Sequence, residues 1–280
     1  MQLSIIIPVF YGEEIFEKCL ATIYPSSVSR LGKDWEILVL NNGFKPERWQ
    51  ELREVYPEIK FYGDGSENLG FARGNNFLLE KARGEYVLMM NPDIFIRPKV
   101  IGKLIAFLEE NSEYSCVAPQ LRFENGTPQF TCRPFPRGFW FLVIDFLAGG
   151  KKYNYFYSPE KSQEVDQPMA SLLLWRGEIL KKLGGFDTHP HFFLYFNDVD
   201  LSYRLKELGG KTFYLASVYA YHIHGHSTRT LKELRRLTLW WKGLGRFWYK
   251  TGSNYLVAYL KAFWITFFSG VAKIFKKIVS

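Results

Sequence analysis

Cysteine is scarce in this sequence of 280 residues, which contains only Cys19, Cys116 and Cys132 and no Cys-x-x-Cys pair. So few and so widely separated cysteines argue against a disulfide framework or a thiolate zinc site, and they favour a reducing compartment. A P-loop, a G-x-G-x-x-G dinucleotide fingerprint and a basic leader before the first apolar run are also missing. We therefore expect a cytoplasmic protein that lacks the common nucleotide-binding fingerprints.

Acidic residues are nearly absent from the end of the chain. Residues 229–280 hold 11 Lys or Arg and one acidic residue, Glu233, so this segment carries +10 while the rest of the chain carries −2. A basic segment on a near-neutral body suggests an anionic partner, such as a membrane surface or nucleic acid.

The apolar pattern of this basic segment favours a membrane surface. The uncharged stretch between Lys261 and Lys273 is only eleven residues long, which is short of the ~20 residues needed to cross a bilayer. Residues 254–279 fit an interfacial amphipathic helix, because aromatic and aliphatic side chains fall on one face and lysines on the other. The contiguous aromatic face disfavours nucleic acid. Packing against the chain's own domain or a second copy, as a homodimer, is the alternative.

The first 100 residues alternate between strand and helix patterns, which predicts an α/β fold with a mostly parallel, buried sheet. Ligands of such sheets bind at the carboxyl ends of the strands. Phe10, Asn42, Asn91 and Asp93 all lie at the expected strand ends. An aspartate there suits a divalent cation that bridges phosphates, although an Asn-Pro-Asp turn is an equally simple interpretation.

Two other segments carry polar groups that suit chemistry. The loop "ENLGFARGNN" opens a helix near Gly70, where backbone N–H groups attract phosphate and Arg73 adds a cation. In "FNDVDLSYRL", Asp198 begins a helix behind an aromatic run that would raise its pKa, as a general base requires, although such a residue is also a common cap. Asp200 and Arg204 are four apart and can form a surface pair.

All histidines lie between residues 189 and 226, and three of them form "HIHGH". In an extended strand His222, His224 and His226 share a face, so a three-histidine metal site is one interpretation. Gly225 weakens that geometry, and a single histidine ligand is the simpler hypothesis.

The order of these motifs resembles the inverting glycosyltransferases of family two, and most closely their rhamnosyltransferase-like branch. This resemblance implies a GT-A type α/β fold with a mostly parallel central sheet covered by helices, followed by the C-terminal amphipathic helical extension. It divides the chain into a nucleotide-sugar-binding half (1–125), an acceptor-side half of the same catalytic domain (126–228) and the basic, aromatic tail (229–280). The motifs that carry it are "SIIIPVFYGEE", "EILVLNNG", "ENLGFARGNN", "YVLMMNPD", "LLLWRGEILKKLGGFD", "FLYFNDVDLSYRL" and "YHIHGHST".

The resemblance also implies roles for the charged residues. Asp93 corresponds to the second aspartate of the family's D-x-D turn, with Asn91 in place of the first, and would hold Mg²⁺ or Mn²⁺ against the donor diphosphate. His222 would be the second metal ligand. Asp198 would deprotonate the acceptor hydroxyl, with Asn197 replacing the glutamate that usually precedes it. The remaining expected contacts are Pro8, Val9, Phe10, Asn42, Gly70, Arg73 and Asn91 for the nucleotide sugar, and Trp175, Asp187 and Arg204 for the acceptor or sugar.

The sequence thus predicts a metal-dependent, inverting hexosyltransferase, peripheral on the inner face of the membrane. It would transfer a sugar from a nucleotide-sugar donor, with rhamnose from dTDP-rhamnose as one candidate, to a lipid-linked or polysaccharide acceptor in cell-surface glycan synthesis. A sugar nucleotidyltransferase is the enzymatic alternative, although the acidic "PVFYGEE" lacks the basic glycine-rich loop that it requires. A catalytically inactive, membrane-bound glycan-binding protein is the non-enzymatic alternative, suggested by Asn91 and Asn197.

Overall fold

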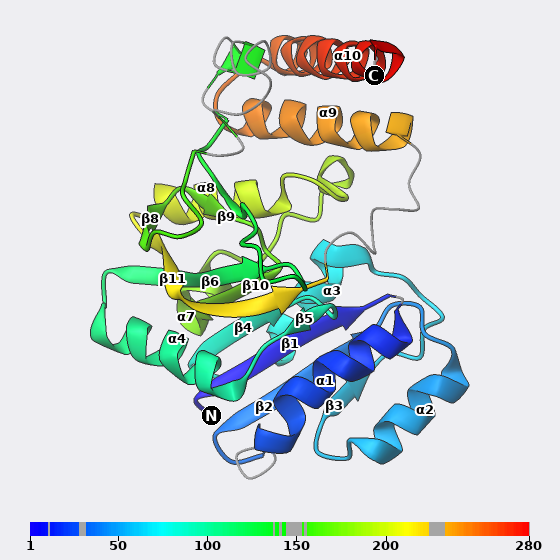
Figure 1. Cartoon of the computed structure of the whole chain (residues 1–280), viewed down its shortest axis with the longest axis vertical. Helices are drawn as coiled ribbons and strands as arrows, with labels where there is room; N and C mark the ends of the chain where they lie inside the picture. Colours follow the sequence, from blue (N-terminus) through cyan, green and yellow to red (C-terminus); the bar gives the residue numbers. More distant parts are fainter. Residues whose placement is uncertain are drawn as a thin grey trace.

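One large β-sheet forms the centre of the molecule, with helices on both faces and two more helices stacked beyond one face (Figure 1). Apolar side chains form one core cluster on each face, so the sheet is buried on both sides. This arrangement confirms the α/β fold that the alternating patterns predict. The computed structural model describes residues 1–10, 12–27, 32–136, 138–139, 142–143, 153, 156–223 and 233–279.

The first half of the sheet is parallel, as predicted. Strands β3, β2, β1 and β4 lie side by side in that order and run in the same direction. Every residue of β1 and β2 is buried, which explains the apolar runs "IIIPV" and "ILVL" within them. Their carboxyl ends meet at one edge of the sheet. The bounds are β1 Leu3–Val9, β2 Trp35–Asn41, β3 Lys60–Tyr62 and β4 Tyr86–Met90.

Beyond β4 the sheet becomes mixed, but β6 and β11 run in the same direction as the first four strands, so the sheet is mostly parallel as predicted. Strand β10 runs antiparallel to β4 and β6, while β11 is parallel to β6 and antiparallel to β5 and β8. An apolar run such as "LLLW" does not encode its direction, so the sequence could not reveal this change. The bounds are β5 Ile94–Phe95, β6 Tyr114–Arg122, β8 Gln163–Val165, β10 Leu172–Arg176 and β11 Lys211–His222, and a separate ladder joins β7 Cys132–Arg133 to β9 Gln167–Pro168.

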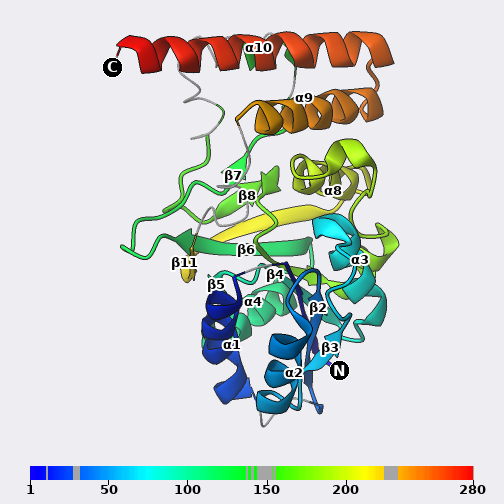
Figure 2. The ribbon, with the colours of Figure 1, turned by 90° about the vertical axis from the view of Figure 1, so that its right-hand side faces the viewer.

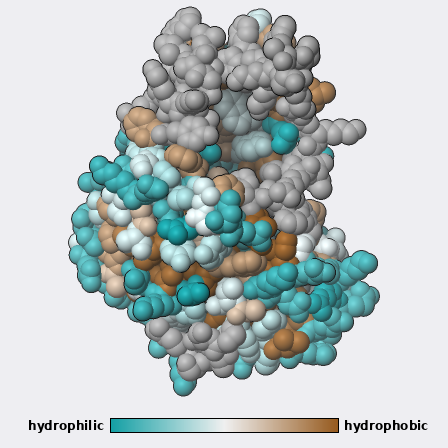
Figure 3. Space-filling model, viewed as in Figure 1, coloured by the Kyte–Doolittle hydropathy of each residue, from teal (hydrophilic) through white to brown (hydrophobic). Residues whose placement is uncertain are grey.

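The helices cover the sheet with amphipathic faces. Helix α4 buries Ile101, Leu104, Ile105 and Leu108, at the spacing of one helical stripe. In the view of Figure 3, hydrophilic side chains dominate the lower part of the surface, where α2 and α4 lie in Figure 1, and apolar side chains gather across its middle. Helices α1 Glu13–Ser27, α2 Pro46–Val55 and α4 Pro98–Glu110 pack on one face, and α3 Gly70–Lys81, α7 Gly177–Lys182 and α8 Asn197–Glu207 on the other.

The end of the chain forms two stacked helices, α9 (Glu233–Lys250) and α10 (Tyr255–Val279), with α10 outermost (Figure 2). A third apolar cluster joins α8 and the short helix η1 (Pro190–Phe192) to α9, and α9 to α10. This confirms the predicted C-terminal helical extension and shows that α9 packs on the catalytic domain. Within the described ranges, no helix is long and apolar enough to cross a membrane.

Candidate active site

A short strand pairing brings Asp93 and His222 together. Strand β5 follows the Asn91 to Asp93 turn and pairs with the end of β11, so that Ile94 lies opposite His222. The backbone N–H of Ile223 donates to the carbonyl of Asp93 at 3.1 Å, which fixes the turn. As a result His222 Nε2 lies 3.5 Å from Asp93 Oδ1, and both side chains are buried at the carboxyl edge of the sheet.

The surroundings of this pair fit a divalent cation. Asp93 Oδ1 is buried and accepts no hydrogen bond from the described residues. His222 Nδ1 lies 2.9 Å from Gln129 Oε1, and Gln129 Nε2 donates to the His222 carbonyl at 2.9 Å. The amide oxygen accepts the Nδ1 proton, so the lone pair of Nε2 faces Asp93, as in second-shell support of a metal-bound histidine.

Only two protein ligands converge at this position. No group of three or more His, Cys, Asp or Glu that would hold a metal occurs in the part of the chain that the structure describes. Mg²⁺ and Mn²⁺ suit this arrangement, because Mg²⁺ usually keeps waters and substrate phosphates beside one or two carboxylates. His224 and His226 of the three-histidine hypothesis lie outside the described residues.

The metal turn and the predicted base share one supporting segment. The backbone N–H of Asn91 donates to the carbonyl of Ser171 at 2.9 Å. The backbone N–H of the adjacent Ala170 lies close enough to the Asp198 carboxylate to lower its pKa. Residues 170 and 171 immediately precede β10, whose antiparallel direction puts them at the edge where β4 ends. The mixed sheet therefore brings Asp198 close to the turn that contains Asp93.

Asp198 lies in the first turn of α8 and keeps part of its surface exposed. Burial raises the pKa of Asp198, and the charge of Arg133 with the backbone N–H groups of Val199 and Ala170 opposes this rise without cancelling it. A carboxylate with a raised pKa is a better proton acceptor than an ordinary aspartate. The arrangement fits the predicted general base.

The backbone before Asp198 is held in an uncommon conformation. Phe196 has φ 69° and is the one non-glycine residue with positive φ in the described ranges. Its ring is buried and packs against Trp240 and Phe247 of α9. Gly243 lets α9 approach, because a Cβ there would lie 2.7 Å from Phe196 Cδ2. Such strain persists only where the surroundings enforce it, so α9 helps to orient the start of α8.

Asn197, which stands in place of the family's glutamate, is 3% exposed. Neither its side-chain oxygen nor its nitrogen has a hydrogen-bond partner among the described residues. A buried amide without partners is costly, and this amide lies directly beside the predicted base.

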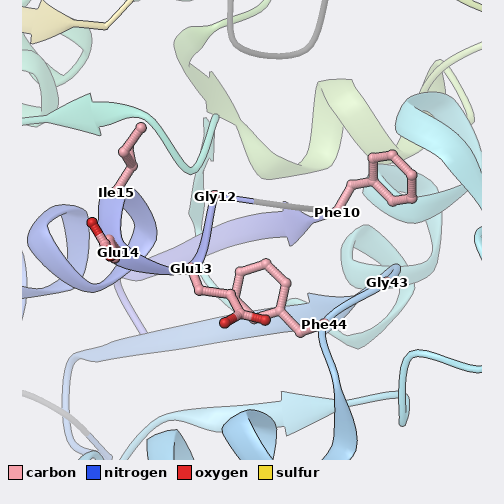
Figure 4. A pocket seen from close by; sticks show the side chains of 7 residues that line it. All are labelled: Phe10, Gly12, Glu13, Glu14, Ile15, Gly43 and Phe44. Atoms are coloured by element: carbon pink, nitrogen blue, oxygen red, sulfur yellow. The ribbon is translucent and has the colours of Figure 1, made fainter. Parts of the chain in front are cut away.

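The donor side of the site surrounds a hollow of about 410 Å³ at the ends of β1 and β2. Phe10 and Phe44 project from these two ends (Figure 4). Gly43 lets the ring of Phe10 lie close to the backbone that follows β2, since a Cβ at position 43 would lie 2.8 Å from Phe10 Cδ2. Glu13 and Glu14 also line the hollow, so it suits a base and a ribose better than phosphates.

Asn42 connects this hollow to α3. Its Oδ1 accepts the N–H of Leu69 at 3.2 Å, and its Nδ2 donates to the carbonyl of Gly70 at 3.3 Å. The side chain thus positions the start of α3, where Arg73 is exposed. Phe193 approaches Gly70 from the loop before α8, so the expected phosphate-binding helix borders the acceptor side. Pro8 and Val9 end β1, and they lie in the buried strand behind the hollow.

The prediction that Trp175 contacts the substrate is wrong. Trp175 is 1% exposed and packs in the core between Val87 of β4 and Cys116 of β6. Because β10 runs antiparallel, its carboxyl end points away from the edge where Asp93 lies.

Asp187 and Arg204 participate in a network that ties α9 to the catalytic helix. Arg204 donates to Asp200 and to the carbonyls of Leu183 and Gly185. The ammonium group of Lys250, at the end of α9, pairs with Asp200 and lies 2.8 Å from Asp187 Oδ2. Burial alone would raise the pKa of Asp187, but the hydrogen bond from Lys250 lowers it, and the net result is a lowered pKa. Contacts of Asp187 and Arg204 with the acceptor stay predictions.

Sequence reasoning missed several of these residues. Gln129 lies in a region without a clear pattern, and Gly243 and Lys250 lie in the segment interpreted as a tail. Asn41, the residue before Asn42, shapes the turn after β2, because its Oδ1 accepts the N–H groups of Gly43 and Phe44. The repeated asparagine in "LNNG" was the one available signal for this turn.

The family model described as "Glycosyl transferase family 2" matches residues 4–170. The chain belongs to glycosyltransferase family 2. This membership confirms the resemblance that the ordered motifs indicate. The matched part contains the donor-side hollow and the Asp93 turn, while Asp198 and His222 follow it.

Three curated relatives are similar to this chain. The low-salt glycan biosynthesis hexosyltransferase Agl10 of Haloferax volcanii is 26% identical over 73% of this chain and 61% of its own length. An N-acetylglucosaminyl-diphospho-decaprenol L-rhamnosyltransferase of Mycobacterium tuberculosis is 25% identical over 69% of this chain and 67% of its own length. Rhamnosyltransferase WbbL of Escherichia coli K12 is 27% identical over 58% and 63%. The chain thus spans 61% to 67% of the length of these relatives.

Solved structures confirm the GT-A type fold. A mannosyltransferase of Pyrobaculum calidifontis in complex with GDP-Man and Mn²⁺ has a TM-score of 0.59 at 15% identity, over 100% of this chain and 76% of that one. GalNAc-T7 with UDP, GalNAc and Mn²⁺ has a TM-score of 0.56 at 12% identity, over 79% of this chain and 44% of that one. At these identities the likeness concerns the fold alone.

Proposed function

We propose that the protein is an inverting glycosyltransferase that moves a sugar from a nucleotide-sugar donor to an acceptor hydroxyl. The observation that carries this proposal is the shared Ala170–Ser171 support, which brings the Asp198 carboxylate beside the turn of Asp93 in a family 2 chain. A proton acceptor and a cation site for a diphosphate are the two groups that direct displacement needs.

The chemistry is a single in-line displacement. The acceptor oxygen forms a bond to the anomeric carbon as the bond from that carbon to the diphosphate oxygen breaks, and the electron pair leaves with the diphosphate. Asp198 takes the proton of the acceptor hydroxyl. Asp93 and His222 would hold Mg²⁺ or Mn²⁺, which when bound neutralises charge on the diphosphate. Arg73 adds positive charge at the start of α3.

For the donor we propose dTDP-rhamnose. The support is that two of the similar relatives are named rhamnosyltransferases. The base and ribose would lie in the hollow beside Phe10 and Phe44.

For the acceptor we propose a sugar linked to a lipid diphosphate, in cell-surface glycan synthesis. One relative is named for such an acceptor, N-acetylglucosaminyl-diphospho-decaprenol. The protein would then work in the cytoplasm, on the inner face of the membrane.

We propose that α10 binds the membrane surface. Its inner side, with Ala258, Ala262 and Ile265, packs in the cluster with α9. Its outer side leaves large apolar residues uncovered among the described residues, beside the exposed Lys261. An apolar side flanked by cations is the pattern of an interfacial helix. These residues, Leu256, Leu260, Phe263, Trp264 and Phe267, are 43% to 64% exposed.

The test is transfer by the full chain from dTDP-rhamnose and UDP-sugars to a decaprenyl-diphosphate-linked N-acetylglucosamine, with Mn²⁺ present. We expect a product of inverted anomeric configuration, measured by NMR, with one donor preferred. Release of pyrophosphate from a nucleoside triphosphate and a sugar phosphate would instead show a nucleotidyltransferase. Glycan binding that needs neither nucleotide nor metal, without transfer, would show an inactive glycan-binding protein.

A further inference from the structure

A cluster of cationic and titratable side chains lies where η1, α9 and α10 meet, apart from the predicted base and metal turn. It consists of Lys242 and Arg246 on α9 with His189 and His191 at η1. Lys242 and Arg246 are four residues apart and project from the same side of α9. We refer to these four residues as the η1–α9 cluster.

The positive charge of this cluster is not balanced by carboxylates. Arg246 Nε is buried without a hydrogen-bond partner, and neither Arg246 nor Lys242 forms an ion pair in the described ranges. Against the effect of burial, the positive charge of Arg246 helps to lower the pKa of the Asp187 carboxyl group. Both of its oxygens are occupied, because Oδ2 lies 2.8 Å from Lys250 Nζ and Oδ1 accepts the N–H of His189 at 2.8 Å.

Burial and this excess of positive charge lower the pKa of both histidines. Burial lowers the pKa of His191, and His189, Lys242 and Arg246 lower it further. Burial and Arg246 also lower the pKa of His189. Concentrated like charge is unfavourable in the free protein, and an anion bound between these groups would relieve the repulsion through charge-assisted hydrogen bonds.

An aromatic row connects the cluster to the outer side of α10. His191 Nδ1 lies 2.5 Å from the hydroxyl oxygen of Tyr259. The ring of Tyr259 lies 4.6 Å from that of Tyr255, which is 54% exposed and precedes the apolar Leu256 and Val257. An anionic headgroup at the cluster would therefore have uncovered apolar surface beside it for its hydrocarbon chain.

The same loop that contributes the histidines also leads to the predicted base. It leaves η1 at Phe192 and enters α8 at Asn197, immediately before Asp198. Phe193 in this loop lies near the start of α3 on the donor side. The cluster is therefore joined to the predicted base by one short segment, residues 192–197.

We propose that the η1–α9 cluster binds the diphosphate of a lipid-linked acceptor, with the lipid chain along the outer side of α10. This inference rests on the proposed function, and it adds the position at which the acceptor's anionic group is held. A diphosphate offers more charge and more acceptor oxygens than a phosphodiester headgroup, so the cluster should distinguish the two.

The test measures binding of the full chain, without donor, to two kinds of phosphatidylcholine vesicle. One contains decaprenyl diphosphate and the other contains phosphatidylglycerol at equal total charge. We expect about tenfold tighter binding to the first kind, the effect of roughly one additional charge-assisted hydrogen bond. Soluble pyrophosphate should compete for the cluster and remove this excess binding.

The Lys242→Gln/Arg246→Gln variant should lose the excess and keep its binding to phosphatidylglycerol vesicles. Arg235→Gln is the matched control, because it removes an exposed charge from the same helix, about 10 Å from Lys242 and about 16 Å from Arg246 along the axis. Lys242→Gln alone serves if the double variant does not fold, and should lose part of the excess. Equal binding of the parent to both vesicles, or an unchanged excess in the variants, would overturn the proposal.

The outcome is separate from that of the proposed function, because no nucleotide sugar is present. A preference for diphosphate in a chain that binds no donor would contradict the transferase and leave the site in place. Donor-dependent transfer by a chain without this preference would support the transferase and contradict the diphosphate site.

Discussion

His222 Nε2 lies 3.5 Å from Asp93 Oδ1, and a pairing of only two residues between β5 and β11 creates this proximity. The two side chains come from opposite halves of the chain and meet at the edge where the parallel strands end. Gln129, from a third segment, orients the imidazole. This geometry fits the predicted cation site.

Gln129→Leu should weaken metal activation without changing the ligands. The variant removes the acceptor for the Nδ1 proton of His222, so the ring loses its fixed tautomer and orientation. Loss of such support costs 10- to 100-fold in metal affinity, measured as the Mn²⁺ concentration that gives half-maximal activity. Gln50→Leu, on the exposed side of α2, is the control. An unchanged Mn²⁺ requirement in Gln129→Leu would show that His222 is not a ligand.

Asp198→Asn should reduce kcat by 10²- to 10⁴-fold, the usual contribution of a general base. Donor affinity should stay within about twofold, because the amide keeps the shape of the side chain and α8 is retained. Steady-state kinetics and donor titration measure the two quantities. Glu207→Gln, exposed at the other end of α8, is the control. Full activity of Asp198→Asn would remove the assignment of the base.

The raised pKa of Asp198 also predicts how this substitution changes stability with pH. In the unfolded chain Asp198 ionises at the ordinary aspartate pKa, whereas in the folded chain it ionises at higher pH. Between these values the folded form binds more protons, so the contribution of Asp198 to stability falls as pH rises. Asp198→Asn should therefore be more stable than the parent at neutral pH, and this advantage should vanish below the ordinary aspartate pKa. Urea unfolding at several pH values tests this expectation. A variant that is less stable at neutral pH would contradict it.

Lys250→Met should loosen the contact between α9 and the catalytic helix. The ammonium group pairs with Asp200, which is 2% exposed, and with Asp187. Removing one partner of a buried charge costs roughly 1–3 kcal/mol, because Arg204 still partly compensates Asp200. Urea unfolding gives the change in stability, and Lys103→Met on the exposed side of α4 is the control. Equal stability of the two variants would show that α9 is not held through Lys250.

Phe263→Asp/Phe267→Asp should release the protein from vesicles while preserving the fold. Both rings are about half-exposed on the outer side of α10. Phe263 also packs edge-on against Trp241 of α9, with ring centroids 5.8 Å apart, so urea unfolding should confirm that the variant keeps its fold. Removing one aromatic ring from the lipid interface should weaken binding by about tenfold or more, measured by sedimentation with anionic vesicles. Val55→Asp, also exposed but on α2, is the control. If the Phe variant still sediments and instead loses a dimer in light scattering, α10 joins two copies of the chain.

Much of the fold was predictable because β1, β2 and β4 have unbroken apolar runs, and buried parallel strands require such runs. The position of Asp93 followed, since it directly ends β4. The direction of β10 was not predictable, because a run such as "LLLW" is buried in either direction.

The acceptor side was less accessible to sequence reasoning. His222 was identified only through the family resemblance, since its partner Asp93 depends on the two-residue strand β5, too short to give a periodic signal. Residues 229–280 read as a separate tail because their charge differs from the rest. The structure shows that Phe247 and Lys250 of this segment pack against the loop and helix that contain Asp198.

The most direct test is thermal stabilisation of the full chain by nucleotide sugars, with and without Mn²⁺, compared with Asp93→Asn and the control Asp34→Asn in an exposed turn. A ligand that binds only the folded form raises the unfolding midpoint with its occupancy. The account predicts a shift with a dTDP- or UDP-sugar that requires Mn²⁺, is lost in Asp93→Asn and is kept in the control. A shift that is equal without Mn²⁺, or equal in Asp93→Asn, would contradict the metal site, and no shift with any donor would contradict the proposed transferase.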